Sequence, residues 1–376
     1  MSTLFHFIHP SMYSTVYMYT ILVLCIVYVV RYSSSDEQRI LHAPEKLPIA
    51  AIILSVMLII FMGFREGVHY FADSYFYAHT YNNVVDGYTT FNTEGEWLFD
   101  NMMYFMKSFQ LPVTYFFALV ELFYIGCVLL ACWRLFPNNT WLALLFCLAS
   151  FGFYSYGVNG IRNGMATSLV MLAIALFQGR KWEKVISVVL MFLALGVHRS
   201  VMLPIAAMFA ATYLVRDTRW AMNFWLFSIV ISLVLGNYIG DFLAGLGFDD
   251  RLSSYFKGQE DAEKMLQFSH TGFRFDFLLY SVMPIVMTWY CTVKRHFRDR
   301  VFNVLAVTYI LSNSFWVMVI RAAYSNRFAY LSWFLYPLVI VYPLLRFDLW
   351  NDQDAKTARI LAVYAGFTYV MFLLGK

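Results

Sequence analysis

The chain has 376 residues, of which 61% are hydrophobic and 13% are charged. A soluble domain averages about 25% charged residues, so this composition leaves too little polar surface to cover a water-soluble fold. The net charge of +4 is small and dispersed along the sequence, so the charge pattern gives no support for nucleic-acid binding. The sequence therefore predicts an integral membrane protein.

Apolar blocks of about 18–22 residues recur along the chain, and this length spans a hydrocarbon core of about 30 Å. They predict an all-α, polytopic membrane protein, with one transmembrane domain over 1–376 and about twelve transmembrane helices, some of them short or broken. The predicted spans are 14–31, 46–64, 111–134, 140–157, 160–178, 184–197, 200–215, 221–245, 275–293, 301–320, 328–345 and 358–375. Short basic turns recur at every second connection, which marks the cytoplasmic side and leaves both termini outside.

Two connections on the outward side differ from these short turns in length and charge. One covers 65–110 and is acidic, and the other covers 246–274 and has mixed charge. Both are too long for plain connectors, so we expect them to fold over the outer face. Four further segments on this side place charge at or near membrane depth. A charge there costs about 2.5–3.5 kcal/mol on insertion scales, so each segment requires an explanation.

The first of these segments, 64–77, follows the second predicted span. It carries Arg65 at the predicted membrane edge and Asp73 in an aromatic stretch with Tyr75 and Tyr77. An interfacial aromatic belt with an arginine that reaches the headgroups explains the tyrosines equally well. It does not explain Asp73, which gains nothing from anionic lipid.

The second segment, 157–166, lies between the fourth and fifth predicted spans. Gly157 and Gly160 loosen the backbone, and Arg162 lies just inside the next helix. An outward turn needs no basic residue by the charge rule. A functional arginine explains this position, and a structural ion pair with a carboxylate on a neighbouring helix is the alternative.

The third segment, 196–204, is the most informative of the four. The stretch 182–216 is too long for one span, whereas Lys184–Val197 is shorter than an ordinary span. Two short helices that meet at His198, Arg199 and Ser200 would place these side chains inside the membrane on the outer side. Broken helices at that depth line a cavity or are buried in protein.

The fourth segment, 319–334, again places arginines against the charge rule. Arg321 ends one predicted span and Arg327 begins the next, both on the outer side. Arg327, Tyr330 and Phe334 fall on one helical face. A structural ion pair is the alternative, although the nearby sequence contains no acid.

The outward arginines share a chemistry that points to a ligand. Guanidinium groups bind phosphate oxygens bidentately and stay charged when they are partly desolvated. Near these arginines the sequence has no D-x-D or H-E-x-x-H metal motif, and the chain has no nucleotide-binding loop, so it predicts neither a metal nor another cofactor. The predicted ligand is an anionic group at the outer leaflet, such as a diphosphate-linked lipid. The arginines concerned are Arg65, Arg162, Arg199, Arg321 and Arg327.

These four segments resemble the motifs of the EpsG-like, Wzy-type family of bacterial polysaccharide polymerases, in order and spacing over most of the chain. The matching residues are Arg65 with Asp73 and Tyr77, Arg162-Asn163 with Ala166, Val197-His198-Arg199-Ser200, and Arg327 with Tyr330. The chain departs from the family pattern at three positions. Asn163 stands where Gln is usual, Arg199 where Pro is usual, and Phe71 where Gly is usual.

The resemblance implies a GT-C-like glycosyltransferase architecture in the bacterial inner membrane, with the active site facing the periplasm. The implied reaction transfers a growing glycan from undecaprenyl diphosphate to the sugar end of another lipid-linked repeat unit. In this interpretation His198 is the first candidate for the base that activates the acceptor hydroxyl, and Asp73 is the second. Arginines would stabilise the departing diphosphate, with Arg162 among the catalytic residues. The remaining candidate substrate-binding residues are Arg65, Arg199, Ser200, Arg321, Arg327, Tyr75, Tyr77 and Tyr330.

Two alternative functions remain open at this point. A flippase for lipid-linked oligosaccharides would also need arginines, but along a path that reaches both leaflets. An O-antigen ligase or another membrane transferase would use nearly the same residues as a polymerase. The expected partners are the lipid-linked donor and acceptor and the membrane lipids. A chain-length regulator and a flippase are candidate protein partners.

Overall fold

The computed structural model describes residues 8–34, 40–71, 73–83, 95–245, 273–321 and 325–375, without the side chains of 236–245. The regular structure in these residues is helical, as the apolar blocks predict. The chain divides into two compact units. The first unit contains the residues up to His198 and those from Val341 onward, and the second contains Arg199–Ile340.

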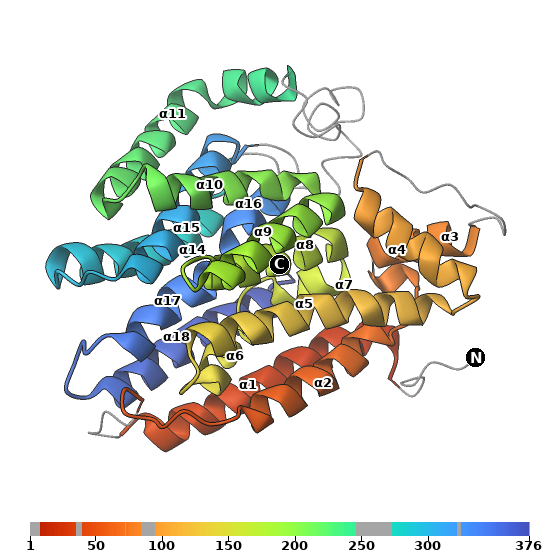
Figure 1. Cartoon of the computed structure of the whole chain (residues 1–376), viewed down its shortest axis with the longest axis horizontal. Coiled ribbons are helices and arrows are strands. Elements are labelled where there is room, and N and C mark those ends of the chain that lie inside the picture. The colour runs from red at the N-terminus through yellow and green to blue at the C-terminus, as the bar shows by residue number, and fades with distance from the viewer. Residues whose placement is uncertain are drawn as a thin grey trace. The chain divides into compact units, whose positions relative to one another are not determined.

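The first unit is built around α8, which packs against α5 and α9. Within α8 only Arg162 and Leu176 are partly exposed, so the helix is buried on nearly all sides. On the other side of α5 lies α2, and α1 packs beside α18 (Figure 1). The helices of this unit are α1 (Tyr13–Tyr32), α2 (Ile49–Gly63), α3 (Asp73–Asn83), α4 (Trp97–Ser108), α5 (Val113–Leu135), α6 (Thr140–Leu148), α7 (Phe153–Val158), α8 (Ile161–Phe177), α9 (Lys181–Val197) and α18 (Gln353–Leu373).

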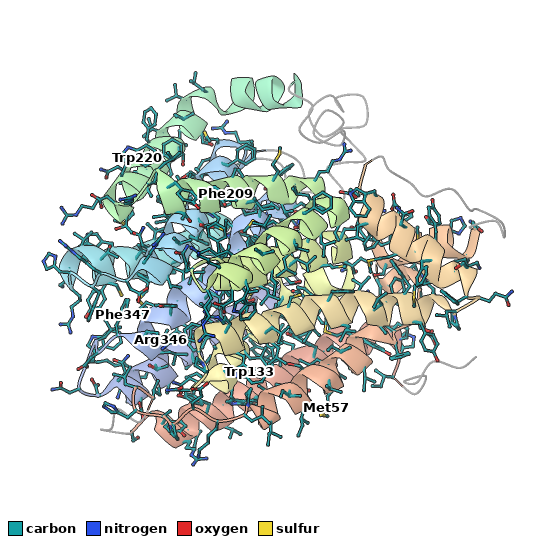
Figure 2. All side chains as sticks on the ribbon, viewed as in Figure 1. Met57, Trp133, Phe209, Trp220, Arg346 and Phe347 are labelled. Carbon is teal, nitrogen blue, oxygen red and sulfur yellow. The ribbon has the colours of Figure 1, made fainter. Side chains whose placement is uncertain are left out.

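Close backbone contact holds α2 to α5. A Cβ atom on Gly63 would lie 2.6 Å from the Cα of Ala118, so no other residue fits at this crossing without a shift. Lipid tails are as apolar as leucine, and helices in a membrane therefore associate through such close packing. The opposite face of α2 is apolar and open, and Met57 on it is 62% exposed (Figure 2). An apolar face of this kind suits contact with lipid.

The second unit is organised around α15, which α10, α11, α14 and α16 contact. Buried polar groups link its helices, since the Trp225 indole donates to Asn313 over 2.7 Å and Asn313 donates to the Ser332 hydroxyl over 2.9 Å. Interhelical hydrogen bonds of this type add specificity to packing in lipid. The helices are α10 (Met202–Tyr213), α11 (Thr218–Gly245), α14 (Phe275–Trp289), α15 (Arg300–Met318) and α16 (Ser325–Trp333), while α17 (Tyr336–Arg346) runs across the boundary of the units.

Six helical segments among the described residues are long and apolar enough to cross a membrane, which makes the chain a multi-pass membrane protein. Two shorter apolar helices, Ile49–Gly63 and Ile161–Phe177, coincide with further predicted spans. The predicted span 140–157 is broken into α6 and α7, with Gly152 between them at a φ of 90°. Short helices account for part of the difference from the twelve predicted spans, whereas α18 (Gln353–Leu373) is long enough and does not qualify. The six are Pro10–Tyr32, Val113–Leu135, Thr218–Leu235, Phe275–Lys294, Arg300–Met318 and Ser325–Arg346.

The two long outward connections have different outcomes. Segment 65–110 contains α3 and α4, so its described part is largely helical. Segment 246–274 lies outside the described residues except for its last two positions. The helix break predicted at 198–200 is present, because α9 ends at Val197 and α10 begins at Met202.

Candidate functional site

Arg65 is fully buried in the first unit, with 0% exposure. Its guanidinium forms a salt bridge with Glu121 on α5 over 3.1 Å. It also donates to the Met62 carbonyl over 2.5 Å and to the Ser74 hydroxyl of α3 over 2.9 Å. The carboxylate inside α5 explains why Arg65 turns inward, because a buried charge requires a partner of opposite sign.

The same guanidinium fixes the turn that precedes α8. It donates to the carbonyls of Gly157 and Val158 over 3.4 and 3.2 Å, and the Ser74 hydroxyl donates to the Val158 carbonyl as well. These carbonyls lie at the end of α7, where helical hydrogen bonds leave acceptors unpaired. Arg65 thereby joins four parts of the unit and sets where α8 begins, one residue before Arg162.

Arg162 belongs to a second group of charges, which we call the acid–base cluster: Glu96, Asp100, Arg162 and His198. One oxygen of Glu96 accepts from Arg162 and the other pairs with Nδ1 of His198. Asp100 accepts a second bond from Arg162 over 3.1 Å. The side chains are 13–24% exposed, so the cluster is partly buried but reachable. The paired residues of the cluster lie 62–102 positions apart in the sequence.

The two carboxylates come from the start of α4. Glu96 immediately precedes this helix and Asp100 lies in its first turn, one helical turn further on, so both side chains share a face. Acidic groups at a helix N-terminus are also favoured by the helix dipole. The start of α4 comes close to the end of α9 because position 196 is glycine. A Cβ on Gly196 would lie 2.8 Å from the Trp97 ring.

His198 is positioned by the end of α9. Its backbone is extended, with φ −154° and ψ 116°, and its N–H still bonds to the Ala194 carbonyl over 2.9 Å. Pro204 follows in the first turn of α10, where a missing N–H is tolerated. Because Glu96 accepts at Nδ1, the other ring nitrogen, Nε2, is the one left to face a substrate.

The electrostatic balance of the cluster is set by its two carboxylates. Burial alone would raise the pKa of Glu96, but the hydrogen bonds and charges of His198 and Arg162 outweigh burial and lower this pKa to about 2. Glu96 is therefore ionised at neutral pH. One arginine against two carboxylates leaves the cluster with one negative charge while His198 is neutral. A histidine that gains a proton here would balance that charge.

Two aromatic rings complete the surroundings of Arg162. Its guanidinium carbon lies 5.0 Å from the centre of the Tyr77 ring and 4.6 Å from that of Phe99. Such cation–π contacts hold the guanidinium in place and favour its charged form. Tyr77 comes from α3 and Phe99 from α4, so both helices of the outward segment support the cluster.

The remaining predicted residues of the first unit lie near the cluster in the sequence but not among the partners of Arg162 or His198. Asp73 begins α3, one residue before Ser74. Tyr75 is 41% exposed and stacks edge-on against Phe76. The structure thus brings together His198, Arg162 and Tyr77 from the predicted set.

The other predicted residues belong to the second unit. Arg199 and Ser200 form a 3-10 turn after His198, and Arg199 is exposed. Arg321 follows α15, and its buried Nε has no hydrogen-bond partner among the described residues. Arg327 and Tyr330 lie one turn apart on α16, with Tyr330 buried and Arg327 half-buried.

Sequence reasoning missed the three carboxylates on which both arginines depend. Glu121 could have been found, because it is the one acid in the span 111–134 and charge at that depth requires a partner. Glu96 and Asp100 carried a weaker signal, since acidic residues in a polar connection cost nothing. As for metals, no three His, Cys, Asp or Glu side chains of the described ranges are grouped as ligands.

Comparison with known proteins gives one match. The sequence model of the EpsG family matches residues 49–375, which covers most of the chain and both units. No curated protein and no solved structure matches the chain.

Proposed function

Because this chain belongs to the EpsG family, a family of membrane proteins linked to exopolysaccharide biosynthesis, we propose that it is a polysaccharide polymerase. It would join oligosaccharide repeat units carried on undecaprenyl diphosphate, at the periplasmic face of a bacterial inner membrane. The observation that carries the proposal is the acid–base cluster, in which Glu96 holds His198 at a helix break on the predicted outward side. This arrangement suits the activation of a sugar hydroxyl.

The proposed step is a glycosyl transfer. The oxygen of an acceptor hydroxyl attacks the anomeric carbon of the donor glycan, and the bond from that carbon to the diphosphate oxygen breaks. The electron pair of this bond leaves with undecaprenyl diphosphate, and the hydroxyl proton moves to Nε2 of His198. General-base assistance of this kind contributes about 10²–10⁴-fold to rate.

Glu96 has two parts in this proposal. It accepts from Nδ1 of His198, which orients the ring and leaves Nε2 as the proton acceptor. Its negative charge then stabilises the imidazolium that forms, as the buried carboxylate does in a Ser-His-Asp triad. The low pKa of Glu96 keeps it ionised, so the proton stays on histidine until product leaves.

Arg162 is better explained as a positioning residue than as a ligand of phosphate. Its terminal nitrogens bind Glu96 and Asp100, and two aromatic rings confine its guanidinium. The net negative charge of the cluster would repel a diphosphate. The sequence-based prediction that Arg199, Arg321 and Arg327 stabilise a leaving diphosphate is kept as it stands.

Further parts of the proposal concern sugars and architecture. Tyr75, exposed at the start of α3, and Tyr77, beside Arg162, present ring faces on which sugars of the acceptor can stack. Helices that end within the unit, as α7 and α9 do, agree with a GT-C-like arrangement in which chemistry occurs at the outer end of the bundle. Asp73 remains the second candidate base.

The proposal is tested by following lipid-linked glycans in cells with and without the protein. Loss of a polymerase should leave single repeat units in place of a ladder of polymer lengths, and H198A and E96Q should reproduce that loss. E183Q is the matched control, because Glu183 forms a salt bridge with Arg134 over 2.7 Å in the same unit, away from the cluster. An unchanged ladder without the protein would refute the polymerase, and repeat units held on the cytoplasmic leaflet would indicate a flippase.

A further inference from the structure

A cavity of about 750 Å³ lies within the second unit, far along the sequence from the acid–base cluster. Two segments form most of its wall. One is the turn between α10 and α11, and the other is the turn between α14 and α15. Both turns belong to the set whose basic residues predict the cytoplasmic side, so the cavity is predicted to open toward the cytoplasm. The proposed polymerase reaction gives it no role.

The charge of the cavity wall is strongly one-sided. Its lining includes Arg216, Arg219, Arg298 and Arg300 against two aspartates, together with His296. Both aspartates accept hydrogen bonds from backbone N–H groups. Asp217 accepts from the Arg219 N–H over 2.9 Å, and Asp299 accepts from the Phe302 N–H over 2.8 Å. No carboxylate of the described residues forms a salt bridge with any of these four guanidiniums. Their donors are therefore available to an anion.

Four arginines in two cytoplasmic turns would also arise from the topology rule alone. That rule requires charge near the membrane but not a shared cavity. Here the two turns are tied together, because the hydroxyls of Thr218 and Thr292 lie 2.8 Å apart. The second turn follows a π-helical segment, Tyr290–Lys294, and holds His296 in the left-handed region at a φ of 56°. The arginines of both segments thus line one hollow.

Apolar side chains beside the cavity indicate where its ligand comes from. Leu214 is 81% exposed and Tyr213 is 59% exposed at the end of α10, directly before Arg216. Trp220 is 54% exposed next to Arg219 and stacks on Phe224 (Figure 2). Exposed aromatic rings next to arginines are typical of the membrane–water interface. A ligand with a phosphate group and acyl chains matches this combination.

We propose that this cavity binds the phosphate headgroup of an anionic phospholipid from the cytoplasmic leaflet. Guanidinium groups of the two turns would hold the phosphate oxygens bidentately, and the acyl chains would lie along Leu214 and Trp220. Basic pockets between helices on the cytoplasmic side are known to bind phospholipid headgroups. The bound lipid would tie α10–α11 to α14–α15 at this end of the second unit.

The test uses the full chain reconstituted in phosphatidylcholine nanodiscs with and without phosphatidylglycerol, with retained lipid counted by native mass spectrometry. R219Q/R298Q removes one arginine from each turn. R180Q/K181Q is the matched control, because it removes two cytoplasmic charges from the first unit. We expect phosphatidylglycerol to bind about thirty-fold more weakly to R219Q/R298Q, from about 5.5-fold for each lost charge, and normally to the control.

Two further arms complete the test. R219K/R298K keeps the charge but loses the bidentate contacts, so its binding should lie between that of R219Q/R298Q and wild type, and this partial recovery shows that the loss in R219Q/R298Q is not misfolding. Inorganic phosphate, added as a competitor, should displace little phosphatidylglycerol, since it lacks the acyl chains. Equal binding by R219Q/R298Q and wild type overturns the proposal. So does equal loss in R180Q/K181Q, or saturation of the arginines by inorganic phosphate in preference to lipid.

Discussion

The first unit contains two arginine–carboxylate groups that look alike in sequence and differ in structure. Arg65 and Glu121 are both 0% exposed, and the two terminal nitrogens of Arg65 also bind carbonyls and a hydroxyl of the protein itself. Arg162 and Glu96 are 17% and 16% exposed, and Glu96 also binds the imidazole ring of His198. A ligand cannot reach the buried Arg65–Glu121 pair, whereas the acid–base cluster is partly exposed and contains a histidine.

The difference shows that a charge in an unusual place can serve the fold or the chemistry. A buried pair contributes little net stability, but the loss of one partner leaves an unpaired charge and is severe. Loss of charge in a part-exposed pair that holds a histidine should lower the reaction rate more than the stability of the fold. A substitution in one of the two groups, followed by measurement of stability and activity, separates their roles.

The largest effect is expected for R65M. It leaves the Glu121 carboxylate buried without its cation, and we expect a loss of about 3–5 kcal/mol in the free energy of unfolding. Thermal unfolding in detergent measures this loss. R65M/E121L, which removes both charges, should recover much of the stability. A stable but inactive R65M would instead place Arg65 in the chemistry.

The next largest effect is expected for H198Q, mainly on the rate of glycosyl transfer. H198Q keeps the size of the side chain at the helix break but removes the base, so glycan elongation should fall by about 10²–10⁴-fold. The thermal unfolding temperature should fall much less than it does in R65M, because the glutamine amide can still donate a hydrogen bond to Glu96. A glycosyl transfer rate within a few-fold of wild type in H198Q would show that another group, with Asp73 first in line, accepts the proton.

Acid should destabilise the cluster through Glu96. Its pKa is lowered from 4.5 to about 2 in the folded protein, so its ionised form stabilises the fold above pH 4.5, and that contribution is lost as the pH falls toward 2. At about 1.4 kcal/mol per pKa unit, the contribution is about 3 kcal/mol, shared with His198 and Arg162. Unfolding as a function of pH measures it. E96Q should flatten the wild-type curve over this interval, and an equally steep E96Q curve would assign the loss elsewhere.

The smallest effect is expected for G196A. The added methyl group meets the Trp97 ring, which has to shift, at a cost of about 1–3 kcal/mol. The shift moves Glu96 away from His198, so activity should fall by more than stability does. G366A is the control, because a Cβ at Gly366 meets no atom within 4 Å. Equal activity of the two variants would mean that the approach of α4 to α9 does not matter for the cluster.

Much of this arrangement follows from local sequence. The helix break at His198 could be predicted because 182–216 is too long for one helix and Lys184–Val197 is too short for a full span. The position of Arg162 inside a helix start followed from the glycines before it. These signals depend on neighbours in the chain, which a single sequence displays directly.

The partners could not be predicted in the same way. Glu96 lies 102 residues from His198, and nothing in hydropathy ranks one acid of a polar connection above another. The close approach of α4 to α9 depends on the contact between Gly196 and the Trp97 ring, and the sequence does not show that these two residues meet. Arg65 is a second case, since its partner Glu121 lies 56 residues further along the chain on another helix.

The central claim is that the acid–base cluster catalyses glycosyl transfer between lipid-linked repeat units. The most direct measurement uses the purified protein in liposomes with undecaprenyl diphosphate-linked repeat units as donor and acceptor. Wild type should produce longer lipid-linked glycans and release undecaprenyl diphosphate, while folded H198Q and E96Q should lose nearly all of both products and E183Q should retain them. Full-rate elongation by folded H198Q and E96Q would contradict the claim.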